Sequence, residues 1–266
     1  MKSFMTRLIS GIVLLAIILV TGILGGPVLF AFNLAISLVG LWEFQKVFHL
    51  EKDLLGVLGT VFAVIYYGGV YLGIPLAAGT LLLISYLMIL MAVYVFTFPK
   101  YRTEQVMAAY FGFCYVPVML SFLYQTRTLP VEGEVTSAVY WLIFICSWGC
   151  DTCAYVVGML LGKHKLAPVL SPKKSIEGAV GGVVGSALLG YLYGMYFTAH
   201  PVVVAILCAV GAVVSQIGDL AASAIKRNHE IKDYGKLIPG HGGILDRFDS
   251  VIFTAPIIYT LAALFL

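Results

Sequence analysis

Long apolar runs separated by short polar or Gly/Pro-containing breaks follow one another along the whole chain. Each run is long enough for an α-helix to cross the hydrocarbon core of a bilayer, which takes about 20 residues. The pattern predicts nine membrane-spanning helices, so the two termini should lie on opposite sides of the membrane. The predicted spans are approximately 8–25, 28–45, 54–73, 76–98, 104–125, 136–162, 176–198, 201–225 and 248–266.

Composition supports this interpretation, because 61% of the residues are hydrophobic and only 11% are charged. So much apolar surface exceeds what one soluble core can bury, and the fold class is therefore an all-α polytopic integral membrane protein. The basic, apolar N-terminus lacks an A-x-A-like cleavage site, which indicates an uncleaved first helix. All five cysteines lie in apolar segments, which favours packing over disulfides, and Cys150 and Cys153 are not expected to form a redox or metal motif.

Basic residues fall almost entirely on alternate connections between the predicted spans. Only Arg127, of the sixteen lysines and arginines, lies on the other set of connections. The positive-inside rule then places the N-terminus and the charged C-terminal connection in the cytoplasm. The opposite side carries short uncharged turns and one acidic loop with Glu132 and Glu134.

Polar residues divide the chain into two predicted regions. Residues 1–135, about five helices, are expected to be an N-terminal transmembrane scaffold whose surface faces lipid or forms a homodimer, with a role in shaping a lipid entrance as the alternative. Glu43, near the cytoplasmic end of the second span, is interpreted as an interfacial residue. Residues 136–266, about four helices, carry acids inside apolar runs and are expected to form a catalytic region around a cytoplasm-facing polar cavity.

The densest charge lies between Ser223 and Ser250, which holds five of the sixteen basic residues and four of the thirteen acids. Basic residues come first, a Pro239–Gly243 turn follows, and two carboxylates, Asp246 and Asp249, end the segment. Cations and backbone N–H groups suit phosphate, and carboxylates one helical turn apart suit a divalent metal. A loop that served only to anchor the helices would need neither the glycines nor the acids. The pattern therefore indicates a metal-nucleotide site.

The string S-x-x-K-R-x4-K-D-x-G-x-L-I-P-G-H-G-G-I-x-D-R-x-D-S resembles the signature of the phosphatidate cytidylyltransferases, or CDP-diacylglycerol synthases. The resemblance is specific between Ser147 and Ser250, and covers the earlier half only in hydrophobic pattern. It implies an integral membrane enzyme of phospholipid biosynthesis that joins CTP to phosphatidic acid, releases pyrophosphate and needs Mg2+.

Asp151 lies near the middle of the sixth predicted span, where an ionised carboxylate costs roughly 2.5–3.5 kcal/mol on insertion scales. An ionised Asp151 would need a nearby cation or a water-filled cavity. The alternative is a purely structural acid that is protonated or hydrogen-bonded. The surrounding D-T-x-A-Y resembles the same family, although Cys153 stands where Gly or Ala is more usual.

The segment S-P-K-K-S-x-E-G, residues 171–178, also resembles a family element, with Ser175 in place of the commoner Thr. Ser171 followed by Pro172 predicts a helix N-cap and first turn, which would put Lys173 and Lys174 beside free N–H groups. Such an arrangement favours an anion, although lysines that only anchor the helix remain an alternative.

Asp219 lies two turns before Lys226 on one helical face and is expected to coordinate metal with Asp246, at a site that Asp249 could complete. A purely structural role for Asp219 is the alternative. His241 either acts on a phosphate or stabilises its turn. The predicted catalytic residues are Asp246, Asp219, Asp249, Lys226, Arg247 and His241, with Asp219, Asp246 and Asp249 as the metal ligands. The predicted substrate-binding residues are Ser171, Lys173, Lys174, Ser175, Glu177, Ser223, Arg227, Lys232, Asp233, Gly240, Gly242, Gly243 and Asp151.

Two other functions fit parts of the pattern. A CTP-dependent polyprenol or phytol kinase would also need CTP, Mg2+ and a lipid acceptor. An anion transporter could use a midplane site built from Asp151 and Asp219, but transport predicts polar groups that reach both faces. The short uncharged turns on one side favour an enzyme.

Overall fold

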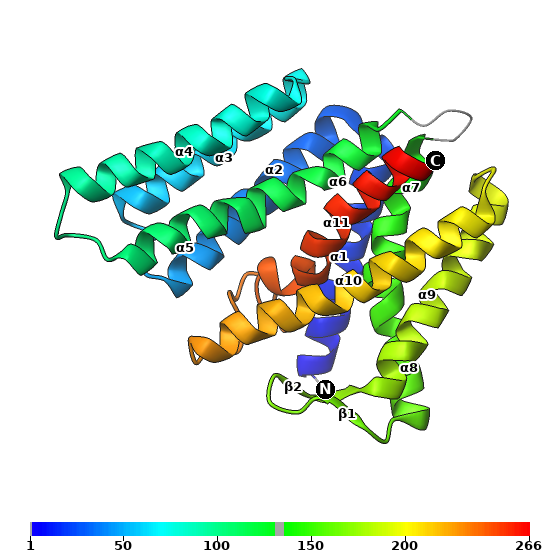
Figure 1. The fold of residues 1–266 in the computed structure, drawn as a ribbon. Coiled ribbons are helices and arrows are strands. Elements are labelled where there is room, and N and C mark those ends of the chain that lie inside the picture. The colour runs from blue at the N-terminus through cyan, green and yellow to red at the C-terminus, as the bar shows by residue number, and fades with distance from the viewer. Residues whose placement is uncertain (1, 131–135) are drawn as a thin grey trace. The chain divides into compact units, whose positions relative to one another are not determined.

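The computed structural model describes residues 2–130 and 136–266, which form α-helices, two short π-helical segments (η1, η2) and one small sheet (Figure 1). The elements are α1 (Lys2–Leu24), α2 (Gly26–Val47), α3 (Leu54–Leu72), α4 (Leu76–Phe96), α5 (Thr103–Phe113), η1 (Cys114–Val118), α6 (Met119–Thr128), α7 (Thr136–Phe144), η2 (Ile145–Gly149), α8 (Cys150–Leu161), β1 (Lys165–Ala167), β2 (Ser171–Ser175), α9 (Ile176–Phe197), α10 (Pro201–Asn228) and α11 (Leu245–Phe265).

The predicted all-α membrane architecture is confirmed. Within the described residues, nine helical segments are long and apolar enough to cross a bilayer. Two of them are composite, because α5, η1 and α6 together form Thr103–Thr128, and α7, η2 and α8 together form Ser137–Leu161. The predicted acidic loop with Glu132 and Glu134 lies outside the described residues.

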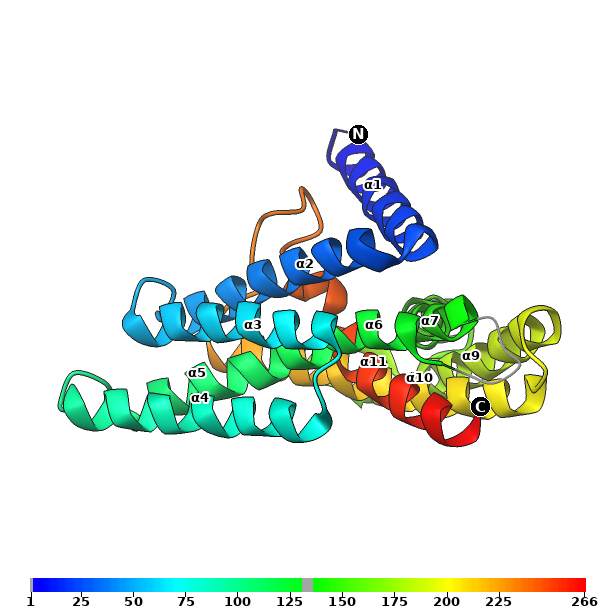
Figure 2. The same ribbon diagram turned by 90° about the horizontal axis from the view of Figure 1, so that it is seen from above.

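Glycine and proline separate the first helices as the sequence predicts. Gly25 and Gly26 both have positive φ angles, 62° and 48°, and Pro27 then starts α2, since proline is tolerated in a first helical turn. Figure 2 shows α1 diverging from α2 at this connection. At the end of α3, Gly73 adopts the left-handed conformation, with φ of 66°, and caps the helix.

The chain divides into two compact units. Unit 1 contains residues 1–121 together with the loop 234–245, and unit 2 contains residues 122–233 and 246–266. The loop between α10 and α11 thus belongs with the N-terminal helices. The predicted functional division at residue 135, into scaffold and catalytic region, stays a prediction.

Unit 1 is built around buried aromatic and aliphatic side chains of α2, α3, α4 and α5, among them Tyr67, Tyr86 and Phe113. Two pairs of polar groups inside this core are joined by hydrogen bonds. The hydroxyl groups of Ser37 and Tyr67 are 2.5 Å apart, and the side-chain amide of Gln45 donates to the carbonyl of Gly56 at 3.0 Å. Such pairing is what makes buried polar groups tolerable.

Glu43 of α2 corrects the sequence interpretation, because it is 1% exposed rather than interfacial. Its carboxylate accepts hydrogen bonds from the backbone N–H groups of Ile244 (3.1 Å) and Leu245 (2.9 Å). These are free donors at the start of α11, where a negative charge also favours the helix dipole. A Cβ on Gly235 or Gly243 would lie within 2.6 Å of the Glu43 carboxyl carbon, so both glycines let the loop close over the carboxylate.

Unit 2 packs α8, α9 and α10 closely through glycines that face cysteines, and Figure 1 shows α8 and α9 running side by side. A Cβ on Gly182 would lie 2.9 Å from the sulfur of Cys150, and one on Gly185 would lie 2.6 Å from that of Cys153. Small residues allow this close approach. All five cysteines are free, as predicted, and the extra volume of Cys153 faces Gly185.

We expect Glu43→Ala to destabilise the protein and to loosen the start of α11. The variant leaves two buried N–H donors without their acceptor, at about 1–3 kcal/mol for each. Thermal unfolding in detergent should shift to lower temperature, and hydrogen exchange of residues 243–246 should become faster. Gln45→Met is the matched control, because it removes a buried hydrogen bond of the same helix that does not reach the loop. Equal exchange of residues 243–246 in both variants would contradict this role of Glu43.

Candidate active site

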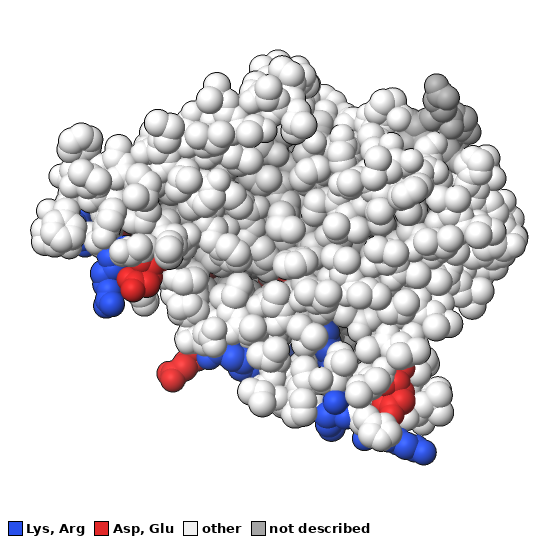
Figure 3. All heavy atoms as spheres, viewed as in Figure 1, with Lys and Arg blue, Asp and Glu red and all other residues white. Residues whose placement is uncertain are grey.

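Unit 2 contains a cavity of about 380 Å³ between α8, α9, α10 and the β1–β2 hairpin. This volume lies within the range of small-molecule sites. Figure 3 shows charged side chains gathered where unit 2 carries the hairpin, whereas the helical surface of that unit away from this end is uncharged on the face drawn. The cavity is lined by Asp151, Ala154, Tyr155, Gly158, Met159, Leu166, Lys173, Lys174, Ser175, Gly178, Ala179, Gln216 and Asp219.

The hairpin replaces the helix start predicted at Ser171, and that prediction was wrong. Ser171–Ser175 is the strand β2, which pairs antiparallel with β1 at Lys165–Ser175 and Ala167–Ser171. Proline also fits an edge strand, and it biases the preceding residue toward extended backbone, so Ser171-Pro172 suits a strand as well as a helix start. The actual N-cap of α9 is Ser175, whose hydroxyl accepts from the N–H of Gly178 at 3.1 Å.

Lys174 nevertheless lies beside Asp219, another of the predicted site residues. Its ammonium group forms an ion pair with the carboxylate of Asp219 on α10, and both side chains are 26% exposed. Lys173, the neighbouring residue on β2, is exposed and lines the same cavity. The strand therefore supplies two cations to the cavity without the help of a helix N-terminus.

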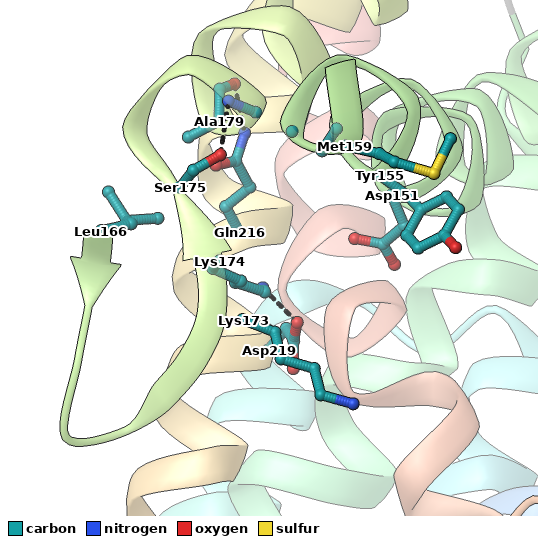
Figure 4. Close-up of a pocket in the computed structure, with 13 residues that line it drawn as sticks. Asp151, Tyr155, Met159, Leu166, Lys173, Lys174, Ser175, Ala179, Gln216 and Asp219 are labelled. Carbon is teal, nitrogen blue, oxygen red and sulfur yellow. Dashed lines mark hydrogen bonds and ion pairs between the residues drawn. The ribbon is translucent and has the colours of Figure 1, made fainter. Parts of the chain in front are cut away.

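Asp151 faces this ion pair from α8 (Figure 4). It lies two residues after the π segment η2 and lines the same cavity as Asp219. The carboxylates of Asp151 and Asp219 lie within electrostatic range of each other and of Lys174. Two acids and two lysines around one cavity suit a ligand that carries both anionic groups and a cation.

Asp246 and Asp249, at the start of α11, are buried at 4% and 9% exposure and do not line this cavity. Asp246 accepts from the ammonium group of Lys226 at 2.9 Å, and Asp249 accepts from the N–H of Ser250 at 2.9 Å. Asp249 is also within electrostatic range of Asp219. The structure thus brings the predicted acids into one region of unit 2. Asp151 and Asp219 line the cavity, whereas Asp246 and Asp249 are buried at the start of α11.

Carboxylate oxygens are the ligands that Mg2+ prefers, and Mg2+ is commonly held by one or two carboxylates together with substrate phosphates and water. Across residues 2–130 and 136–266, no group of three or more His, Cys, Asp or Glu side chains is arranged to hold a metal ion. Asp151 and Asp219, which line one cavity, could supply the one or two carboxylates that such a Mg2+ site needs. The three-aspartate ligand set stays a prediction.

Arg247 lies near the same acids, within electrostatic range of Asp151 and Asp249. Its backbone carbonyl accepts from the indole N–H of Trp148 at 3.4 Å. Its side-chain Nε is buried and has no hydrogen-bond partner within the described residues. A buried guanidinium N–H without an acceptor suits a phosphate oxygen, which is consistent with the predicted role of Arg247.

Other predicted residues have different surroundings. Glu177, in the first turn of α9, accepts from the backbone N–H groups of Lys163 and His164 and pairs with the His164 ring at 2.6 Å, so it holds the connection that enters the hairpin. Ser223 is half-buried on α10. Arg227, Lys232 and Asp233 are exposed at the end of α10 and in the loop that follows it.

The glycine turn of unit 1 contains the predicted residues Gly240, His241, Gly242 and Gly243. Gly240 and Gly242 have φ angles of 76° and 87°, and Ile238 donates to the carbonyl of Gly242 at 2.8 Å, which closes the turn. The N–H of His241 donates to Ile238 within the same turn. Gly243 faces Glu43, as described above, so the structure gives this glycine a carboxylate as its neighbour.

Sequence reasoning missed Tyr155, Met159 and Gln216 as cavity residues. Helical spacing carries the signal, because Tyr155 and Met159 follow Asp151 by one and two turns, and Gln216 precedes Asp219 by three residues. The side-chain amide of Gln216 donates to the carbonyl of Ala179 at 3.1 Å, which ties α10 to α9 beside the cavity (Figure 4).

Comparison with known proteins gives consistent results. The model of the Cytidylyltransferase family matches residues 5–265. The chain is 32% identical over 264 residues to a phosphatidate cytidylyltransferase of Staphylococcus saprophyticus and 34% identical over 264 residues to one of Staphylococcus aureus strain COL, covering 95% of this chain and 96% of each relative. It is 39% identical over 172 residues to a phosphatidate cytidylyltransferase of Bacillus subtilis, covering 64% of this chain and 61% of the relative.

The family match extends over nearly the whole chain, beyond the motifs between Ser147 and Ser250. Two of these relatives exceed 30% identity over nearly their full lengths. The resemblance noted from the sequence is therefore confirmed. This chain belongs to the cytidylyltransferase family.

Proposed function

We propose that this protein is a phosphatidate cytidylyltransferase, a CTP-dependent nucleotidyltransferase that converts CTP and phosphatidic acid into CDP-diacylglycerol and pyrophosphate. The observation that carries the proposal is the full-length similarity to relatives of that name, on a chain whose apolar helices enclose a charged cavity. An integral membrane enzyme is suited to this reaction, because one substrate is a lipid and the other is a soluble triphosphate.

CTP binds in the cavity of unit 2, with its phosphates at Lys173 and Lys174. The Lys174 ammonium group forms an ion pair with Asp219. An arriving triphosphate offers this ammonium group stronger charge-assisted hydrogen bonds, so Lys174 turns to the phosphates and the Asp219 carboxylate is exposed.

The carboxylates that would hold Mg2+ are Asp219 together with Asp151, Asp246 and Asp249, the further acids of the region. The bound cation would supply neutralisation of charge on the phosphates. The residues of the chain contribute position and charge. Lys226 holds Asp246 at the start of α11, and Arg247 has a buried Nε–H that no described residue accepts, which we assign to a phosphate oxygen.

The reaction requires no protein nucleophile. A phosphate oxygen of phosphatidic acid attacks the α-phosphorus of CTP, the bond from that phosphorus to the bridging oxygen of the β-phosphate breaks, and pyrophosphate leaves with the electron pair. Both reactants are anions, so bringing them together is the main task. Lys173, Lys174 and Arg247 reduce this repulsion by countering charge on the phosphates.

The site faces the cytoplasm in this proposal, and the N-terminus lies on the same side. Support comes from the basic residues, of which only Arg127 falls on the opposite set of connections. CTP is a cytoplasmic nucleotide, which requires the same orientation. A homodimer, formed through the exposed apolar helices, is the proposed oligomeric state.

Labelled CTP tests the reaction type directly. Purified protein, phosphatidic acid, Mg2+ and α-labelled CTP should yield a labelled lipid and equimolar pyrophosphate, whereas γ-labelled CTP should yield labelled pyrophosphate and no labelled lipid. Transfer of the γ-label to lipid would show a kinase instead. Uptake of CTP or phosphate by vesicles without lipid product would favour a transporter.

Lys174→Ala should lower kcat/KM for CTP by about 10- to 100-fold, which corresponds to a charge-assisted hydrogen bond of about 1.5–3 kcal/mol. Lys165→Ala is the matched control, because Lys165 is an exposed lysine of the same hairpin that does not line the cavity. Steady-state kinetics with varied CTP measures both variants. Equal losses in the two would mean that Lys174 acts only through the general charge of the hairpin.

Asp219→Asn and Asp246→Asn should each reduce turnover by about 10²- to 10³-fold while the protein still inserts and folds. Asp219→Asn should also raise the Mg2+ concentration that gives half-maximal activity, since a carboxylate ligand is lost. Glu104→Gln, at an exposed acid paired with Arg102, should leave the Mg2+ titration unchanged. Normal turnover in Asp219→Asn would refute its proposed place at the metal.

A further inference from the structure

A second cavity, of about 310 Å³, lies in unit 1 between α1 and the glycine turn that precedes α11. It is separate from the nucleotide cavity, with which it shares no lining residue. Its lining is Arg7, Leu8, Gly11, Ile12, Leu15 and His241. In Figure 2 the loop that carries the turn rises from the helices of unit 1 near α1.

The turn and α1 fit each other through specific contacts. The hydroxyl of Ser10 donates to the carbonyl of Pro239 at 2.7 Å. A Cβ on Gly240 would lie 2.6 Å from Cγ of Arg7, so only glycine lets the arginine stem lie across the turn. A Cβ on Gly11 would lie 3.7 Å from Cε1 and 3.8 Å from Nε2 of His241, so that edge of the ring faces the small residue of α1.

The chemistry of the lining is divided between cationic or polar groups and apolar ones. Arg7 is always charged and presents a planar set of donors that matches a phosphate, and His241 adds a ring nitrogen. Leu8, Ile12 and Leu15 are 46%, 57% and 47% exposed, and their spacing places them in one stripe along α1. No aspartate or glutamate is among the described residues of this lining.

We propose that this cavity binds phosphatidic acid, with the phosphomonoester at Arg7 and His241 and the first part of an acyl chain along Leu8, Ile12 and Leu15. The inference rests on the proposed function and assigns its lipid substrate to a subsite. Charge complementarity and the apolar stripe together select an anionic amphiphile, because a nucleotide or free phosphate would leave the stripe unused. The closing loop continues directly into α11, which begins with the carboxylates of Asp246 and Asp249.

His241 has a feature that suits this role. Its Nδ1 is buried and has no hydrogen-bond partner within the described residues. No protein acceptor therefore fixes the tautomer of the ring, and the edge that faces α1 is available to donate to a phosphate oxygen. This supports the action of His241 on a phosphate, the first of its two predicted roles.

Kinetics of cavity variants test the proposal. Arg7→Leu should raise the KM for phosphatidic acid about tenfold or more in mixed micelles and leave the KM for CTP within about twofold, since one charge-assisted contact is worth about 1.5–3 kcal/mol. Gly11→Leu, which fills the cavity, should have the same effect. Gly11→Ala should have little, because its Cβ makes only an ordinary contact at 3.7 Å.

The matched charge control is Lys46→Leu. Lys46 is a cation of α2 in the same unit that lies over the Trp42 ring at 3.6 Å, and it does not line the cavity. Its removal should leave both KM values unchanged. A rise in the KM for CTP with either Arg7→Leu or Gly11→Leu, or unchanged KM for phosphatidic acid in both, would overturn the inference.

Direct binding separates this inference from the proposed function. Dioctanoyl phosphatidic acid should bind to the wild-type protein in detergent by calorimetry, more weakly to Arg7→Leu, and inorganic phosphate or dioctanoylglycerol should not compete. Arg7-dependent binding without formation of a cytidine-bearing lipid would refute the function and keep the subsite. Wild-type turnover, together with lipid binding that neither Arg7→Leu nor Gly11→Leu weakens, would keep the proposed function and refute the subsite.

Discussion

A carboxylate among apolar helices must have a partner, and this constraint determines most of the polar structure of the protein. Glu43 is satisfied by two backbone N–H groups at the start of α11, Asp219 by Lys174, and Asp246 by Lys226. In each case the partner comes from another segment of the chain. The acids therefore fix the hairpin, the glycine turn and the beginning of α11 in place.

These partnerships differ in how readily they can be exchanged. Glu43 is fully enclosed and holds uncharged donors of the backbone, so its bonds are structural. Lys174 and Asp219 are each about one quarter exposed and border an open cavity, where a polyanion and its cation can replace each partner with another of the same charge. One physical requirement thus produces enclosed hydrogen bonds in unit 1 and an exchangeable ion pair in unit 2.

Local signals in the sequence predicted the apolar helices and the close glycine contacts of α9. They also marked Asp151, Asp219 and Lys174 as candidate site residues, but not that these three line one cavity. The hairpin was not predictable from Ser171-Pro172, because the same dipeptide suits a helix start and an edge strand. The role of Glu43 was also hidden, because its partners follow about 200 residues later and a backbone N–H leaves no mark in the sequence. The chemistry of the side chains could be inferred from the sequence, whereas hydrogen bonds from distant backbone N–H groups could not.

The π segment η2 ends two residues before Asp151 and determines which way the rest of this helix faces. A π turn accommodates one residue more than an α turn would, so it absorbs one residue without turning the helix that follows. If the same residues instead formed a regular α-helix, everything after them would be rotated by about 100°. Asp151, Tyr155 and Met159, which line the cavity from one face of α8, would then turn away from it together. The widened turn is therefore what directs these three side chains into the cavity.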